Sequence, residues 1–173
     1  MSFQDFFNDY QIFKENYSGL RQQANIYRVD NVIFYINCLK EIADMQKLTF
    51  GKEISVLIMT DRLYGHAVGL NEYLQNSTDT TVYLVDTLTD AIKIVDKTKL
   101  DFLIIVGYLS NKRYYSVIQA VKETNESVSI VILATLDSLI DDECREYNIP
   151  YRFSKKRPMR EFVDYLRQIK GLS

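Results

Sequence analysis

Residues Leu100 to Leu109 read L-D-F-L-I-I-V-G-Y-L and predict the central strand of this protein. Within it, Asp101 precedes five consecutive apolar residues, and the chain is expected to turn at Gly107. An unbroken apolar run bounded by turn residues is typical of a strand buried on both faces of a parallel sheet. Ligands and reacting groups in open α/β sheets gather beyond the carboxyl ends of such strands. Here that end carries the apolar side chain of Val106, which offers no acid, thiol or imidazole.

Alternating strands and helices extend from this run in both directions. Apolar patterning predicts strands over 54–59, 81–85, 101–106, 128–133 and 149–153. A helix pattern follows each strand, with Thr87 and Ser110 as expected N-caps. The helices are expected over 64–74, 88–97, 137–147 and 160–169, and after Ser110 with an apolar stripe from Tyr114 to Val121. Five such units joined by right-handed crossovers predict a five-stranded, parallel, doubly wound α/β sheet with helices on both sides.

Residues 1–50 differ from the rest of the chain and predict an N-terminal extension of two helices. A second, long helix is expected over 20–48, since this stretch has no proline and no internal glycine. Its apolar positions, Ile36 among them, form two adjacent rows and therefore a broad face that needs a partner surface. We hypothesise a homodimer through 20–48. Docking of this helix on the first helix or on the following domain, 51–173, is the alternative.

Composition and charge exclude several classes of protein. The 173 residues are 47% hydrophobic, which indicates a folded core, and the formal net charge of −2 disfavours nucleic acid and anionic lipid as partners. Cys38 and Cys144 lack the spacing of a metal or redox site. No long apolar run and no signal-peptide pattern occurs, so we expect a soluble, cytoplasmic protein.

Motifs for cofactors and catalysis are missing. The chain has no glycine-rich phosphate loop after any strand and no serine nucleophile elbow, so we expect neither an enzyme nor a cofactor. The segment His66-Ala67-Val68-Gly69 resembles the H-x-x-G of cobalamin-binding domains, but Tyr64 stands where those domains want an aspartate. The preferred interpretation of His66 is a partly exposed histidine in the first turn of a helix.

The size and spacing of the five units, over residues 53–171, resemble the receiver domain of two-component response regulators. The resemblance implies four functional positions. The acidic pair that holds Mg²⁺ in the family corresponds to Thr60-Asp61, and the phosphoacceptor aspartate corresponds to Val106. The hydroxyl residue after the fourth strand corresponds to Thr135 with a one-residue slip, and the Lys-Pro pair corresponds to Arg157-Pro158.

These substitutions predict that the chain is a pseudo-receiver. Phosphoryl transfer to a protein needs a carboxylate nucleophile and a metal that neutralises developing charge. Val106 cannot act as a nucleophile, and Asp61 alone is a poor ligand set for Mg²⁺. We therefore expect a non-enzymatic, phosphorylation-independent signalling protein that acts through protein contacts. In the family, the region that corresponds to 137–170 commonly carries output contacts.

Two further groups of residues are candidates for contact. The one basic cluster comprises Arg152, Lys155, Lys156, Arg157 and Arg160. It suits an acidic protein partner or is a solvated loop. The nearby acids and the overall charge disfavour nucleic acid.

Aromatic residues form the second group. Tyr108, beyond the central strand, is either an exposed contact residue or a ring packed on Val106, and we expect Tyr115 to face solvent when Tyr114 packs inward. A small-molecule site is the alternative function, in a crevice lined by Asp61, Tyr64, Val106, Tyr108 and Thr135.

Overall fold

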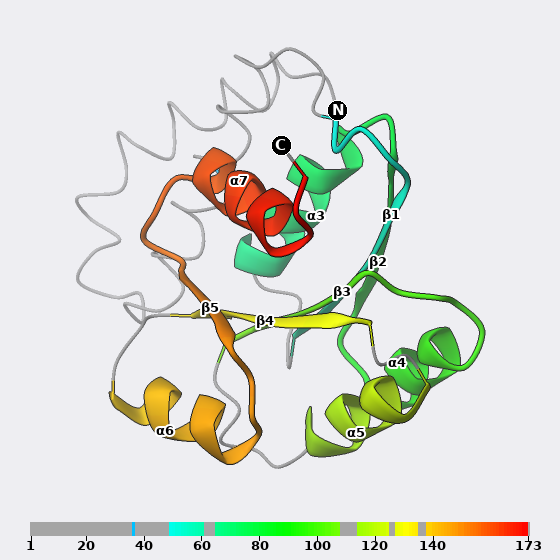
Figure 1. Cartoon of the computed structure of the whole chain (residues 1–173), viewed down its shortest axis with the longest axis vertical. Coiled ribbons are helices and arrows are strands. Elements are labelled where there is room, and N and C mark those ends of the chain that lie inside the picture. The colour runs from blue at the N-terminus through cyan, green and yellow to red at the C-terminus, as the bar shows by residue number, and fades with distance from the viewer. Residues whose placement is uncertain are drawn as a thin grey trace, which may run out of the picture.

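The computed structural model describes residues 36, 49–60, 65–107, 114–124, 127–134 and 138–172 (Figure 1). Strands and helices alternate throughout this part of the chain. In order they are β1 (Ile54–Thr60), α3 (Gly65–Gln75), β2 (Thr80–Val85), α4 (Leu88–Val95), β3 (Phe102–Val106), α5 (Tyr115–Thr124), β4 (Ser129–Ala134), α6 (Ser138–Glu146), β5 (Tyr151–Ser154) and α7 (Met159–Ile169). The five strands form one parallel sheet in the order β2-β1-β3-β4-β5, which confirms the predicted fold.

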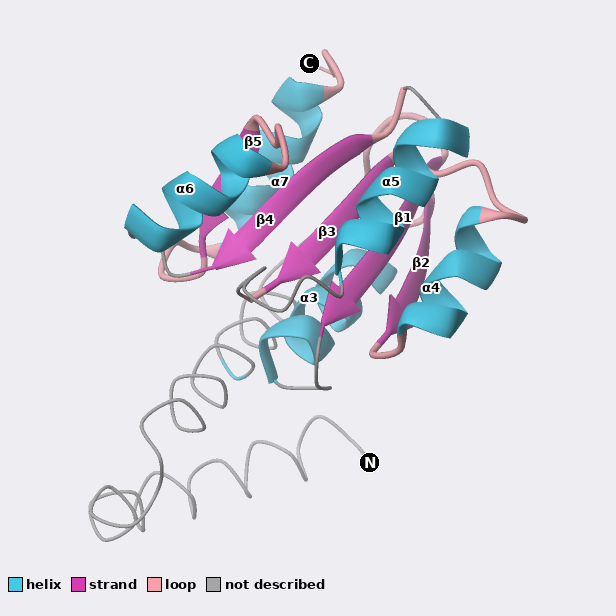
Figure 2. Ribbon diagram, turned by 90° about the horizontal axis from the view of Figure 1, so that it is seen from below, coloured by secondary structure: helices cyan, strands magenta, loops and turns pink. Residues whose placement is uncertain are grey.

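The helices cover the two faces of the sheet in unequal layers. Helices α3 and α7 lie on one face, and α4, α5 and α6 lie on the other (Figure 2). Because alternate residues of a strand point to opposite faces, each strand feeds both cores. In β3, Phe102, Ile104 and Val106 pack under α3 and α7, while Leu103 and Ile105 pack under the other three helices.

The central position of β3 is confirmed. All five of its residues are buried, and it pairs with β1 on one side and β4 on the other. Asp101, which precedes it, fixes the amino edge of the sheet. Its carboxylate accepts a hydrogen bond from the Ser55 backbone N–H at 3.0 Å and lies 3.9 Å from the Lys170 ammonium. Lys170 also donates to the Ser127 carbonyl at 3.0 Å, so these contacts tie the C-terminal end of α7 to the sheet.

Strand β5 begins later than predicted. Asn148 has a positive φ of 51°, and the Ile149 N–H bonds to the Cys144 carbonyl at 2.8 Å, so Ile149 belongs to the turn that closes α6. Pro150 follows and has no N–H to donate to a ladder. Pairing with β4 therefore starts at Tyr151, opposite Val131.

Asp79, in the loop between α3 and β2, binds the segment that precedes β1. Its carboxylate accepts hydrogen bonds from the Thr49 and Ser77 hydroxyls at 2.6 and 2.5 Å. It also accepts from the backbone N–H groups of Phe50 and Gly51 at 2.8 and 2.7 Å. Desolvation raises the pKa of Asp79, but these hydrogen bonds outweigh it and lower the pKa to about 2.

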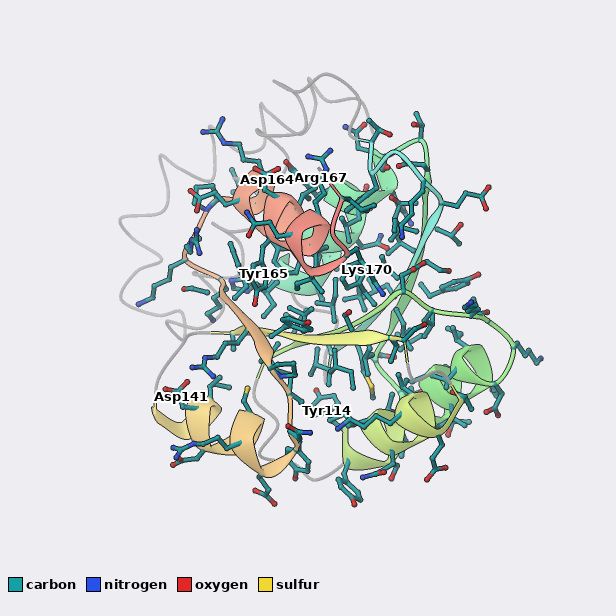
Figure 3. All side chains as sticks on the ribbon, viewed as in Figure 1. Tyr114, Asp141, Asp164, Tyr165, Arg167 and Lys170 are labelled. Carbon is teal, nitrogen blue, oxygen red and sulfur yellow. The ribbon has the colours of Figure 1, made fainter. Side chains whose placement is uncertain are left out.

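Helix α7 contacts the same segment from its outer side. Arg167 and Asp164 project from the side of α7 away from the sheet, whereas Tyr165 and Lys170 lie on the side that faces it (Figure 3). The Arg167 guanidinium donates to the Thr49 carbonyl and lies 5.7 Å from the centre of the Phe50 ring. Phe50 is itself buried in the core under α3 and α7, so the chain is anchored before β1 begins.

Of the predicted N-terminal extension, residues 36, 49 and 50 are described. Ile36 is helical and only 6% exposed within a single chain. This position of the predicted apolar face is therefore covered without a second copy of the protein. The remaining positions of the two predicted helices lie outside the described residues.

Candidate functional site

The carboxyl edge of the sheet is where the family resemblance places a phosphorylation site. Thr60 ends β1 directly opposite Val106, which ends β3, and Val106 pairs in turn with Leu133 of β4. Thr60 is 1% exposed and Val106 is 7% exposed. Gly107 then turns the chain with a φ of +113°, which is easy for glycine, and its N–H bonds to the Leu133 carbonyl at 3.0 Å. The ends of the three central strands are thus buried at Thr60, Val106 and Leu133.

His66 stands close to this edge and corrects one expectation. The predicted partial exposure is wrong, because His66 is only 4% exposed in the first turn of α3. Burial, together with the positive charge of Lys155, lowers the pKa of His66 from 6.5 to about 3. His66 is therefore a neutral imidazole at physiological pH. Among the described residues, it and Thr60 are the two buried polar side chains.

Lys155 is the residue of the basic cluster that reaches this edge. Its backbone N–H bonds to the Ala134 carbonyl at 2.9 Å, which extends the β4–β5 ladder one step beyond Ser154. Tyr151 and Phe153 face the core under α3 and α7, and the two-residue repeat of a strand places position 155 on that same face. This placement explains how the half-buried Lys155 side chain, beyond the edge strand β5, lowers the pKa of His66, which follows β1.

Arg157, matched to the family lysine by the resemblance, lies on the surface instead. Its guanidinium donates to Glu161 at 2.6 and 2.8 Å and lies 4.6 Å from the centre of the Phe153 ring. Arg152 pairs in the same way with Asp141 at 3.1 Å. Lys156 and Arg160 are exposed. The two ion pairs neutralise part of the predicted basic cluster and further disfavour nucleic acid.

The described residues do not fit a magnesium site. At the two described positions where the family has carboxylates, this chain has an apolar side chain, Val106, and a hydroxyl, Thr60. No group of three or more His, Cys, Asp or Glu side chains in the described ranges could hold a metal ion. Over the same ranges, no helix is long and apolar enough to cross a membrane. The remaining predicted positions, Asp61, Tyr64, Tyr108 and Thr135, lie outside the described residues.

Sequence reasoning missed the neutral, buried His66 and its coupling to Lys155. One signal could have indicated the burial, since Ala67, Leu70 and Tyr73 around it are all inward-facing positions of α3. The coupling could have been found from strand alternation, by counting two residues onward from Phe153. The predicted orientation of the tyrosine pair is confirmed, with Tyr114 buried and Tyr115 exposed.

Comparison with known proteins shows the fold. No family model and no curated protein matches the sequence. Among solved structures, the response regulator domain of Thermotoga maritima CheB aligns with a TM-score of 0.56 at 12% identity, over 70% of this chain and 99% of that chain. The non-phosphorylated HemR receiver domain of Leptospira biflexa aligns with a TM-score of 0.56 at 15% identity, over 70% and 97%.

A third similar structure contains a phosphorylated aspartate, the modification for which this chain has Val106 at the matching position. It is a response regulator protein from Burkholderia pseudomallei with a phosphorylated aspartic acid, which aligns with a TM-score of 0.55 at 16% identity, over 66% of each chain. These alignments show a shared backbone arrangement. Because the identities are low, the chemistry at the carboxyl edge has to be inferred from this chain's own residues. The described α/β unit has the fold of response-regulator receiver domains.

Proposed function

We propose that this protein is a non-enzymatic regulatory protein that uses a receiver fold for protein contacts and is not controlled by phosphorylation. The observation that supports this most directly is Val106. It is buried and in register with Thr60 and Leu133, at the family's phosphoacceptor position. A valine side chain there has no atom that can accept a phosphoryl group.

The surroundings of Val106 support the same proposal. Nucleophilic phosphoryl chemistry on a protein is assisted by a cation at the developing charge. Here the half-buried cation near this edge, Lys155, faces a neutral imidazole, and the matched Arg157 is engaged by Glu161 on the surface. The burial of His66 and Thr60 supports a packing role for the described part of this edge.

The proposal retains the homodimer through residues 20–48, with one restriction. Ile36 is already covered within one chain, so the dimer face would use other positions of the apolar rows. Light scattering of the full chain after size exclusion tests this directly. A dimer mass supports the proposal, and a monomer mass at all accessible concentrations refutes this part of it.

Phosphorylation independence has its own test. The full chain is incubated with acetyl phosphate and Mg²⁺, with a phosphorylatable receiver domain as the positive control, and intact masses are measured. We expect the control to gain a phosphoryl group and this chain to remain unmodified. A labile phosphoryl adduct on this chain would overturn the proposal, because another residue would then serve as the acceptor.

The contact function is tested by capture of a partner. The immobilised full chain is exposed to nuclease-treated native lysate, beside a matched column carrying Val106→Ile. This variant changes the edge without adding a reactive group. A stoichiometric protein retained by the wild type supports a contact function, and its equal retention by the variant places the contact away from the edge. Absence of any enriched protein would count against the proposal.

A further inference from the structure

A pair of aromatic rings lies on the face of the sheet opposite α3 and α7. Tyr115, the first residue of α5, is 47% exposed and is the one large apolar side chain left exposed in the described part of the chain. Its ring centre lies 5.7 Å from that of Tyr147, just beyond α6, at a tilt of 49°. Two helices from separate units thus join to present one aromatic surface.

Two carboxylates of α6, Glu143 and Glu146, act on Tyr147. Desolvation, and then the negative charges of Glu146 and Glu143, raise the pKa of Tyr147. Glu146 is exposed, and among the described residues no lysine or arginine nitrogen lies within 4.0 Å of its carboxylate. The other acids of α6 are used differently, because Asp141 pairs with Arg152 and Asp142 pairs with Arg145.

The chain's own nearby cation is engaged by a backbone carbonyl. The Lys122 ammonium donates a hydrogen bond to the Tyr147 backbone carbonyl at 2.9 Å. It therefore satisfies the C-terminal end of α6. No lysine or arginine in the described ranges lies over the Tyr115 or Tyr147 ring. The surface combines the exposed Tyr115 ring with the exposed Glu146 carboxylate, and both features attract a cation.

We infer that Tyr115, Tyr147 and Glu146 form a docking point for an arginine side chain from a basic segment of a partner protein. This inference rests on the proposed contact function and specifies the chemistry of the partner. A planar guanidinium can stack on an aromatic ring while its N–H groups pair with a carboxylate, which an ammonium does less well. Tyrosine and arginine are also the residue types that dominate binding energy in protein interfaces.

The test measures binding of a fluorescein-labelled peptide in which three arginines alternate with glycine. The matched peptide replaces each arginine with citrulline, which keeps the shape and removes the charge. We expect the full-length protein to bind the arginine peptide and to bind the citrulline peptide at least about tenfold more weakly, because the cation is lost. Equal binding of the two peptides, or no binding of the arginine peptide, would overturn the inference.

Four variants localise the binding. Tyr115→Ala should weaken it about threefold through loss of the ring, and Tyr115→Phe should preserve it. Glu146→Lys should weaken it about fivefold, because attraction becomes repulsion. Glu72→Lys, an equal charge change at an exposed position of α3 on the opposite face, should stay within about twofold of the wild type. Unchanged binding by Tyr115→Ala or Glu146→Lys would overturn the inference.

All four variants are tested as folded protein, which urea midpoints matching the wild type confirm. Failure here can be told apart from failure of the proposed function. If a partner is captured from lysate equally by the wild type, Tyr115→Ala and Glu146→Lys, the arginine docking point is refuted while the contact function stands. Self-association of the chain that Tyr115→Ala abolishes would refute it too, since the surface would then serve a second copy.

Discussion

The single histidine of this protein should make its stability fall as the solution becomes mildly acidic. His66 is buried, and its pKa lies near 3 in the folded protein, against 6.5 for an exposed histidine. Between these two values the unfolded chain binds a proton that the folded chain does not. Stability is therefore greatest above pH 6.5 and is lost progressively as the pH falls toward 3.

The magnitude follows from the same two values. At pH 7 the unfolded histidine is mostly neutral, and at pH 5 it is almost fully protonated, while His66 in the folded state remains neutral at both. Linkage then predicts that the free energy of unfolding falls by about 2 kcal/mol between pH 7 and pH 5. Carboxylates add little over this range, because their usual pKa values lie below it.

Urea unfolding at pH 7, 6 and 5 and constant ionic strength measures this change. The comparison is His66→Gln, which keeps a neutral polar group and cannot titrate. We expect the wild type to lose stability over the range and the variant to remain nearly constant. Since the chain has one histidine, the titration of its ring protons by NMR reports the same group without ambiguity.

Two results would refute this reasoning. An NMR titration midpoint between 6 and 7 would show that the imidazole is solvated in the folded state. A parallel fall in stability of the wild type and His66→Gln would assign the pH dependence to other groups. Lys155→Met provides a further check, since removing the adjacent positive charge should raise the midpoint of His66 without restoring 6.5.

Three other substitutions test the core, the loop that anchors the chain, and Val106, which stands where the family has its phosphoacceptor aspartate. Phe162→Ala should cost about 3–5 kcal/mol in urea unfolding, because the ring is fully buried and lies 5.0 Å from that of Phe153. A loss below about 1 kcal/mol would contradict this packing. Asp79→Asn should cost about 1 kcal/mol at pH 7, a value discounted for partial exposure of the carboxylate. Because the Asp79 pKa is lowered from 3.8 to about 2, this difference should shrink as the pH falls from 4 to 2, and a constant difference would exclude the charge as its cause. Val106→Asp should destabilise the protein by several kcal/mol, about 3 or more, through burial of a carboxylate at a site that is 7% exposed. Rescue of that variant by Mg²⁺ would contradict the interpretation of this edge as a packing surface.

The fold was predictable because its signals are local and repeated. The apolar run through Phe102–Val106 can only be accommodated in the middle of a sheet, and the stripes of α5 and α7 follow directly from helical spacing. The start of β5 was not predictable from its apolar residues alone. Ile149 looks like a strand residue, but the positive φ of Asn148 and the closing bond to Cys144 assign it to a turn.

The candidate site was predicted less completely, for a different reason. Loss of the nucleophile could be seen in one letter, Val106. The burial of His66 depends on chain segments distant in sequence, and the effect of Lys155 on it crosses from β5 to α3. Pairing by motif selected Arg157 because a proline follows it, whereas the alternation of β5 favours Lys155 as the inward cation.

The contacts around Asp79 fix the position at which the chain enters β1. A pull on the chain before Thr49 is resisted first by the Asp79 carboxylate and by Arg167, and only then by the hydrogen-bond ladder of β1. Because Arg167 belongs to α7, a force applied at Thr49 is transmitted to that helix. Residues 49–51 are thus bonded both to the loop before β2 and to α7, and a force applied ahead of them would be transmitted to that helix.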